Sequence, residues 1–261
     1  MGLRFTFVLL CLLAGVVNAA PATPSSPHKA YLSLIIDDLG QNLPRDRQVL
    51  ALPGPVTAAI MPDTPHAAEF AREAHRAGKL VMLHMPMDPA TGPFAWHPDL
   101  PIEELGKRLD AAFAAVPYTS GINNHMGSRM TAQRGAMTWL MGELQRRHLF
   151  FVDSRTSAAT VAAAEAQAQA LGHVSRDVFL DDVRTTEAIT TQLQQGVALA
   201  HRQGSAVLIG HPYPQTLQVL EQQMPRLKSQ GIELITLSQM IAERGNQAMP
   251  AHGKHGRYSN R

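Results

Sequence analysis

Five short apolar runs in this chain of 261 residues each end in an aspartate or a histidine. The polar residues that follow the runs are Asp37 with Asp38, His84, His125, Asp153 and His211. Runs of four to eight β-prone residues between turn signals are typical of buried strands in a parallel sheet. In a β/α barrel the carboxyl ends of the strands open on one face, which carries the active site. Five such residues at successive strand ends therefore indicate a hydrolytic metal site.

Two adjacent carboxylates, Asp37 and Asp38, follow the most apolar part of the first predicted strand. They repel each other and lose hydration there, and a divalent cation commonly offsets that cost. Because side chains alternate along a strand, we expect the two carboxylates to point in different directions, so that one ligates a metal and its neighbour acts as a base. The alternative is a solvated turn in which an aspartate caps a helix.

Three histidines extend this hypothesis. Asp38, His84 and His125 together supply one carboxylate and two imidazoles, a set that suits zinc or another divalent first-row metal. His125 lies in the polar segment GINNHMGS, which is typical of a ligand or substrate loop, whereas His84 taken alone is more typical of a core histidine. Pro212 keeps His211 out of helical geometry, and a histidine beside a metal suits general acid catalysis near neutral pH.

Further polar groups are expected on the same face. Pairs of arginine and aspartate are more often structural than catalytic, although one such pair can orient His211 or the metal ligands. We expect supporting or substrate-binding roles for Asn123, Asn124, Ser128, Asp153, Arg155, Asp177 and Asp181.

The local composition of the sequence predicts that the chain consists of four segments. Residues 1–19 have the pattern of a secretory signal, with Arg4 before an apolar stretch that is short for a membrane span; an uncleaved anchor is the alternative. Residues 20–29 are a Pro/Ser-rich linker, 30–245 form one domain, and 246–261 are a basic tail that we expect to be disordered. We expect cleavage near Ala20, a periplasmic location and no stable membrane insertion after cleavage.

Cysteine and charge exclude several classes of protein. Cys11, the only cysteine, lies within the predicted signal, so the mature chain would contain neither disulfides nor thiolate zinc sites. Without Arg4 and the three basic residues of the tail, the chain carries 19 basic and 21 acidic residues. This balance provides no basic surface for nucleic acid.

The elements that must position these side chains alternate between strand and helix. Helical patterns cover residues 64–77, 101–116, 133–147, 157–171, 185–203 and 215–230. Strands are expected at the five apolar runs and also at 56–61, 174–180 and 232–237. Seven or eight strand–helix units in about 215 residues predict a single (β/α)7-8 barrel.

Six motifs in order resemble the divergent polysaccharide deacetylase family, exported relatives of the NodB-type carbohydrate esterases. The motifs are Ser33–Gly40, Leu83–Pro89, Gly121–Ser128, Phe151–Ser157, Asp177–Asp181 and Gly210–Thr216. The resemblance covers residues 30–244 and implies a distorted β/α barrel of the NodB type. In that superfamily one aspartate and two histidines hold a divalent metal, an adjacent aspartate is the base, and a late histidine is the acid.

The resemblance assigns roles to residues of this chain. It implies that Asp37 is the base, Asp38 and His84 are metal ligands, and His211 is the acid. The superfamily's second ligand histidine follows the first by four residues, where this chain has Asp88. We therefore expect His125, on the next strand, to take that role.

These inferences predict an amide or ester hydrolase that depends on a divalent metal, most simply zinc, and that acts as an N-deacetylase of a cell-envelope polysaccharide. The alternative is a catalytically silent carbohydrate-binding or envelope scaffold protein that keeps the barrel without turnover. Release of acetate from acetylated glycans distinguishes the two, because a silent protein would bind glycan without releasing any.

Overall fold

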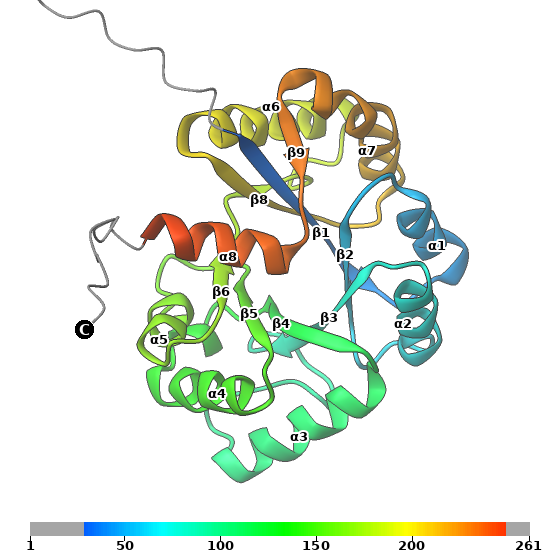
Figure 1. Ribbon diagram of the computed structural model, residues 1–261. Helices are drawn as coiled ribbons and strands as arrows, with labels where there is room; N and C mark the ends of the chain where they lie inside the picture. The colour runs from blue at the N-terminus through cyan, green and yellow to red at the C-terminus, as the bar shows by residue number, and fades with distance from the viewer. Residues whose placement is uncertain (1–28, 249–261) are drawn as a thin grey trace, which may run out of the picture.

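Nine parallel strands form one sheet within residues 29–248, the part of the chain that the computed structural model describes (Figure 1). The strands are β1 Ala30–Leu39, β2 Val56–Ile60, β3 Leu80–Met87, β4 Thr119–Met126, β5 Phe150–Asp153, β6 His173–Ser175, β7 Val178–Phe179, β8 Ser205–Gly210 and β9 Ile232–Leu234. Eight run in the order β6-β5-β4-β3-β2-β1-β8-β7, and β9 pairs with the start of β1. The predicted fold class, a distorted α/β barrel, is confirmed.

Helices follow most strands and cover the outside of the sheet (Figure 1). The α-helices are α1 Leu43–Ala51, α2 Ala67–Arg76, α3 Ile102–Ala115, α4 Arg134–Arg146, α5 Ala162–Ala168, α6 Thr186–Gln203, α7 Pro214–Leu227 and α8 Leu237–Ala248. Short 3₁₀ helices lie at Met130–Ala132 and Lys228–Gln230. The helices α1 and α8 were not among the predicted segments, and α8 continues past the predicted domain boundary at residue 245.

Local sequence signals explain where several helices begin and end. The side chain of Asn42 accepts a hydrogen bond from Arg45 N at the start of α1, and Thr185 does the same for Ala188 N at the start of α6. Such caps satisfy backbone N–H groups that have no partner inside the helix. Gly204 ends α6 with a φ of 89°, a conformation that glycine adopts without steric cost.

The predicted strand 174–180 is wrong as a single element, because it is two strands on opposite edges of the open sheet. Its first part, β6, pairs with β5, and its second part, β7, pairs with β8. Between them the chain crosses from one edge to the other at Arg176 and Asp177. Arg176 N donates to Asp153 O, and Asp177 N donates to Val207 O. The strands β6 and β7 end the strand order on opposite sides, and the sheet curves so that this short segment bridges them. The result is a barrel that is open along the line between β6 and β7, which we call the seam.

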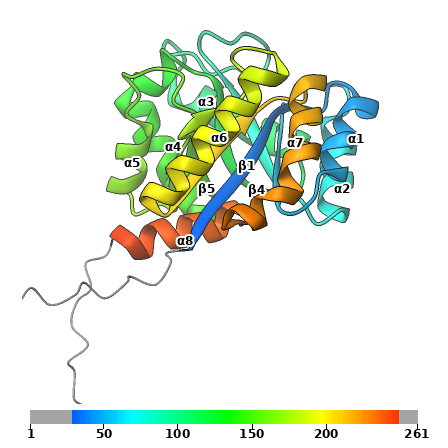
Figure 2. The same cartoon turned by 90° about the horizontal axis from the view of Figure 1, so that it is seen from above.

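Two apolar regions hold the barrel together. One lies between the sheet and the surrounding helices. The other fills the barrel interior and contains Ile35, Met82, Val207 and Ile209. Leu237 and Met240 of α8 are buried in this interior region, so α8 closes the amino-terminal end of the barrel, where β1 begins (Figure 2). Both ends of the described chain lie at this end, opposite the carboxyl ends of the strands.

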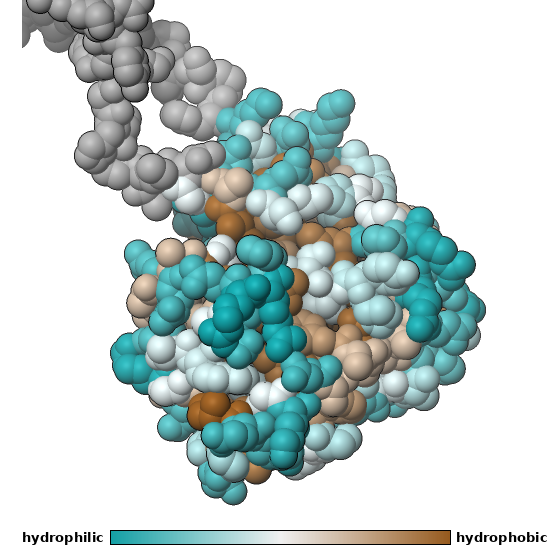
Figure 3. All heavy atoms as spheres, turned by 60° about the horizontal axis from the view of Figure 1, so that its bottom comes forward, coloured by the Kyte–Doolittle hydropathy of each residue, from teal (hydrophilic) through white to brown (hydrophobic). Residues whose placement is uncertain are grey.

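The face of the described domain in Figure 3 is largely polar. Hydrophilic residues cover most of the face in Figure 3, and hydrophobic residues are seen mainly in a band between them. Among the residues described, no helix combines the length and apolar character that a membrane crossing requires. The predicted signal, most of the linker and most of the tail lie outside the described residues.

Candidate active site

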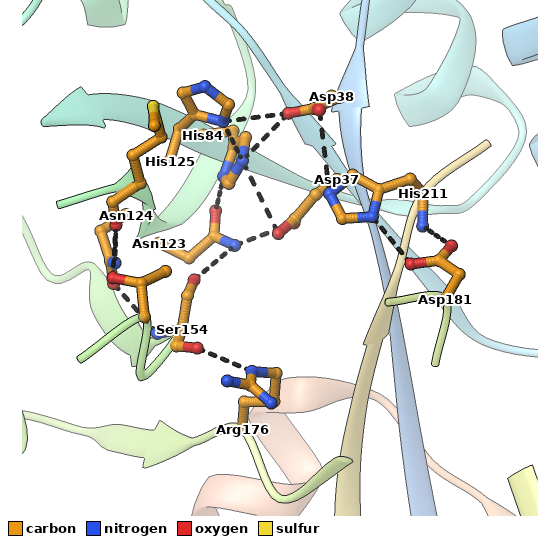
Figure 4. A network of polar contacts seen from close by, with 12 residues as sticks. Asp37, Asp38, His84, Asn123, Asn124, His125, Ser154, Arg176, Asp181 and His211 are labelled. Atoms are coloured by element: carbon orange, nitrogen blue, oxygen red, sulfur yellow. Dashed lines mark hydrogen bonds and ion pairs between the residues drawn. The ribbon is translucent and has the colours of Figure 1, made fainter. Parts of the chain in front are cut away.

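The barrel interior leads into a polar cluster at the carboxyl ends of the strands. Asp37, His84 and His211 each lie two positions beyond a side chain of the interior region. Those interior side chains are Ile35, Met82 and Ile209. Because every second residue of a strand faces the same side, these three polar side chains continue the inward rows into the mouth of the barrel (Figure 4).

A bulge in β1 brings Asp38 to the same mouth. Ile36 pairs with Ala58 and Leu39 pairs with Ile60, so β1 contains one residue more than β2 over this stretch. Asp38 has a φ of 57°, in the left-handed region. A bulged residue re-aims its side chain. The expectation that the paired carboxylates diverge is therefore wrong, since both face the site (Figure 4).

Asp38, His84 and His125 form a compact triangle. Asp38 Oδ1 lies 3.1 Å from His125 Nδ1 and 3.3 Å from His84 Nε2, and the two nitrogens are 3.1 Å apart. Asp38 Oδ1 is buried, and it accepts no hydrogen bond from any of residues 29–248. A buried carboxylate oxygen without a donor is costly.

The triangle fits a divalent metal. Donor atoms bound to one such ion at zinc-like distances lie roughly 3 to 3.5 Å from each other, as these three atoms do. Together they could supply one carboxylate and two imidazole ligands. Asp88, at the spacing of the superfamily's second histidine, is instead bound by Arg129 Nη2 at 2.7 Å and lies 3.4 Å from His97 Nδ1.

Asn123 joins the triangle to Asp37. Its amide nitrogen donates to Asp37 Oδ1 at 2.9 Å and lies 3.3 Å from Ser154 Oγ, so its oxygen faces His84 Nδ1 at 2.8 Å. That oxygen can only accept, and His84 therefore carries its proton on Nδ1 when neutral. The lone pair of His84 Nε2 is then directed at the triangle, as metal ligation requires.

His211 faces the triangle from the opposite side. Its Nε2 lies 3.7 Å from Asp38 Oδ2, and its Nδ1 donates to Asp181 Oδ1 at 2.9 Å. Asp181 Oδ2 also accepts from the backbone N–H of His211 at 2.6 Å and from Thr216 Oγ1 at 2.7 Å. Three donors thus fix this buried carboxylate, which in turn fixes the ring of His211 (Figure 4).

The electrostatics of the two carboxylates differ. Burial raises the pKa of Asp37, and this effect exceeds the opposing effects of His84, His211 and the Asn123 hydrogen bond. For Asp38, burial acts in the same direction, but its contacts with His125 and His84 outweigh burial and hold the pKa well below its usual range. Asp38 is therefore a permanent anion, whereas Asp37 is suited to take up a proton.

His84 and His211 both favour the charged form. Burial lowers the pKa of His84, but the charge of Asp37 and the contacts with Asp38 outweigh it and raise the pKa to about 9. Burial also lowers the pKa of His211, and the hydrogen bond to Asp181 with the charge of Asp37 outweighs it, so that the net shift is upward. A protonated His211 can serve as a general acid.

A cavity of about 380 Å³ opens beside these groups. It is lined by Asp37, His84, Asn124, His125, Met126, Ser154, Arg155, Thr156, Arg176, Phe179, Ile209 and His211. A second hollow of about 470 Å³ reaches Asp38 and His125 from the side of α1 and α2. The triangle therefore lies between two spaces that are open to solvent.

Two predicted supporting residues lie elsewhere, for identifiable reasons. Asp153 is on the outward row of β5, where it accepts from Arg155 N and Thr160 Oγ1. The carboxylate of Asp177 accepts hydrogen bonds from Val207 N of β8 and from Arg244 Nη2 of α8, and so stabilises the seam. Neither carboxylate contacts the triangle, and Asp153 bears on the site only through the backbone N–H of Arg155, which it holds.

Four of the other predicted supporting residues lie at the site. Asn123 and Asp181 contact Asp37 and His211 as described above. Asn124 Oδ1 accepts from Ser154 N at 2.9 Å, and Arg155 lines the cavity. Ser128 lies two residues beyond the end of the strand β4. No hydrogen bond links its side chain to the site within the described residues.

Sequence reasoning assigned no individual role to three residues at the site, which are Ser154, Phe179 and Thr216. Ser154 continues the inward row of β5, one position beyond the outward Asp153, and strand alternation would have identified it. Phe179 lies in β7 and Thr216 at the start of α7, where no periodic pattern marks a site residue.

The open parallel barrel and the triangle at its mouth define a protein with the deacetylase-like fold. The sequence pattern of the divergent polysaccharide deacetylase family matches residues 34–241, and the chain belongs to this family. It is 39% identical over 230 residues to the uncharacterized protein YibQ of Escherichia coli, covering 86% of this chain and 72% of that protein.

Two solved structures show the same fold. An uncharacterized protein of Agrobacterium tumefaciens has a TM-score of 0.78 at 21% identity, with 84% of this chain and 92% of that chain covered. A family 4 acetyl xylan esterase from Clostridium thermocellum, in complex with a cobalt ion, has a TM-score of 0.52 at 14% identity, with 82% and 92% covered.

Proposed function

We propose that this protein is an exported, metal-dependent hydrolase that removes acetyl groups, most simply N-acetyl groups, from a cell-envelope polysaccharide. The observation that supports it most directly is the triangle of Asp38, His84 and His125, flanked by Asp37 and His211. The buried Oδ1 of Asp38 accepts no hydrogen bond from the described residues. Membership of the divergent polysaccharide deacetylase family supports the substrate class.

The triangle would hold the metal, most simply zinc. When bound there, a divalent ion would polarise the acetyl carbonyl and lower the pKa of water. A metal-dependent activity also agrees with the cobalt ion in the acetyl xylan esterase of the same fold. Asn123 prepares the triangle, because it holds the His84 proton on Nδ1, away from the metal.

Asp37 and His211 divide the proton transfers. Asp37 Oδ1 is held by Asn123, and Asp37 Oδ2 lies 3.6 Å from His84 Nε2, so the carboxylate stands beside the triangle without completing it. Its raised pKa suits a base that takes a proton from attacking water. His211, kept protonated by Asp181, would donate its Nε2 proton to the leaving amine.

Metal analysis of the purified full-length protein tests the ligand set. We expect about one divalent ion per chain, as a three-residue ligand set would hold, and its loss in Asp38→Ala and His125→Ala. His75→Ala is the matched control, because His75 is an exposed histidine of α2 that stacks on Tyr118 outside the site. Unchanged metal content in both site variants contradicts the proposed ligand set.

Acetate release tests the reaction itself. Acetylated glycans and small acetyl esters are incubated with the protein loaded with zinc, cobalt or nickel, and we expect acetate in at least one combination. Glycan binding without acetate release in every metal would instead favour the silent carbohydrate-binding protein, an alternative motivated by Asp88 at the usual ligand position.

The proposal includes export. An Arg-led apolar stretch before Val17-Asn18-Ala19 supports a cleaved secretory signal and a periplasmic location. Amino-terminal sequencing of protein from the periplasmic fraction should begin near Ala20. A chain that keeps Met1 or Gly2 contradicts cleavage.

A further inference from the structure

Two arginines, Arg155 and Arg176, stand on one wall of the 380 Å³ cavity. Some arginines of the described chain, such as Arg129 and Arg244, pair with carboxylates. Neither Arg155 nor Arg176 forms an ion pair with any carboxylate of residues 29–248. The cavity is therefore lined by two arginines that have no carboxylate of the described residues as a direct ion-pair partner.

Arg176 is held in place by neutral groups. Its Nε donates to Ser154 O at 2.7 Å, its Nη2 donates to Arg155 O at 2.9 Å, and its guanidinium lies 5.1 Å from the centre of the Phe179 ring. These contacts fix the orientation of the group without neutralising it (Figure 4). Its Nη1 remains without a hydrogen-bond acceptor among the described residues.

Arg155 adds its charge from the rim. It follows β5 with a φ of 49°, and its backbone N–H is held by Asp153 Oδ1 at 2.8 Å. Its side chain is exposed. Burial, and next the charge of Arg155, lower the pKa of Arg176, and the more distant charges of Asp153, Asp37 and Asp177 offset this only in part. An anionic ligand would relieve the repulsion between the two cations and the cost of burying Arg176.

We propose that the cavity binds an acidic glycan, in which a sugar carboxylate contacts Arg155 and Arg176 while a neighbouring acetylated group reaches the triangle. This inference rests on the proposed deacetylase function and specifies its substrate class. A guanidinium fork matches the two oxygens of a carboxylate. Arg176 and the base Asp37 line the same cavity, so one sugar unit or its neighbour can contact both.

Calorimetry with matched ligands tests the proposal on the metal-loaded, full-length protein. The probes are a tetrasaccharide of alternating N-acetylglucosamine and glucuronic acid, and the same tetrasaccharide with its carboxylates reduced to alcohols. We expect the acidic form to bind at least about tenfold more tightly, the size of effect that one hydrogen-bonded charge pair gives.

Variants assign this preference to the two arginines. In Arg155→Gln and in Arg176→Gln, the preference for the acidic tetrasaccharide should fall below about threefold, which is less than one charged hydrogen bond contributes. Arg176→Lys should keep part of the preference. Arg72→Gln is the charge-matched control, because Arg72 is exposed on α2 and forms no ion pair among the described residues. If Arg176→Gln does not fold, Arg155→Gln decides the question, since the side chain of Arg155 makes no hydrogen bond within them.

Three outcomes overturn the proposal, namely equal binding of the two tetrasaccharides, no binding of either, or a preference that survives in both arginine variants. Acetate release is scored separately. If the protein binds the acidic glycan selectively but releases no acetate, this inference is kept and the hydrolase function is contradicted. If it releases acetate equally from neutral and acidic glycans, the hydrolase function is supported and this inference is contradicted.

Discussion

The two ring nitrogens of His84 need opposite protonation states if the triangle is to bind a metal. Nδ1 must donate to Asn123, while Nε2 must lose any proton before it can ligate a metal. Because its pKa is raised to about 9 in the absence of metal, the ring is doubly protonated at neutral pH. Metal binding must therefore expel one proton.

We predict that metal affinity rises with pH up to about pH 9 and then levels off. Below that value each pH unit should change the affinity by about tenfold, because one proton competes with the metal. Calorimetric titration of zinc in buffers of different ionisation enthalpy measures the released protons. Release of no proton near pH 7 would show that His84 is already neutral there.

In the proposed mechanism, the pair of His211 and Asp181 would set the alkaline limit of activity. If His211 is the acid, turnover falls as pH rises through its pKa, and Asp181 raises that pKa against the effect of burial. Asp181→Asn removes the charge but keeps an oxygen that can accept from the ring. We predict that the alkaline limb of the kcat/KM profile moves to lower pH, with the acid limb, assigned to Asp37, little changed.

Thr216→Val serves as the control for this prediction. It removes one hydrogen bond to Asp181 but leaves the charge, so the alkaline limb should move much less. An alkaline limb that stays in place in Asp181→Asn assigns that limb to a group other than His211.

At the scale of single elements, the bulge of β1 decides which carboxylate reaches the triangle. Asp38 adopts a φ of 57°, which costs most for β-branched residues. We predict that Asp38→Val is less stable than Asp38→Gly by about 1 to 2 kcal/mol, since glycine tolerates this conformation. Urea unfolding of the metal-free variants measures the difference.

The same pair of substitutions at Thr57, in the regular strand β2, is the matched comparison. There the order should reverse, because valine favours an extended strand and glycine weakens it. If valine and glycine rank alike at both positions, Asp38 is not held in the left-handed region.

Strand alternation explains which parts of the site could be predicted from the sequence. Asp37, His84 and His211 continue inward rows whose earlier members are apolar, so their convergence follows from period-two patterning and parallel strands. The same rule identifies Asp153 as outward and Ser154 as inward, a distinction that the assignment of Asp153 to the site overlooked.

Other features depend on pairing between distant segments and could not be predicted in this way. Nothing in the sequence around Asp38 marks the extra residue, because a bulge is defined only against the partner strand β2. The split between β6 and β7 likewise depends on Asp177, whose side chain accepts from Val207 N on a strand 30 residues away.

At the scale of the whole molecule, α8 closes one end of the barrel and the site occupies the other. Leu237 and Met240 are fully buried against the interior region. We predict that Leu237→Ala lowers the free energy of unfolding by about 2 to 4 kcal/mol while acetate release per folded molecule changes little. Chemical unfolding and active-site titration measure the two quantities.

Ser238→Ala, an exposed change in the same helix, is the control and should affect neither quantity. If Leu237→Ala stays folded but loses turnover, packing of α8 against the barrel interior affects the arrangement of the active site at the other end.

The position of the chain ends has a consequence for handling the protein. The described chain begins just before β1 and ends with α8, both at the end of the barrel that α8 closes (Figures 1 and 2). A support attached beyond either end would therefore hold the domain by this end, with the active-site end facing outward. Immobilisation through an amino-terminal or a carboxyl-terminal tag should therefore leave the cavity equally accessible to a long polymer approaching from solution.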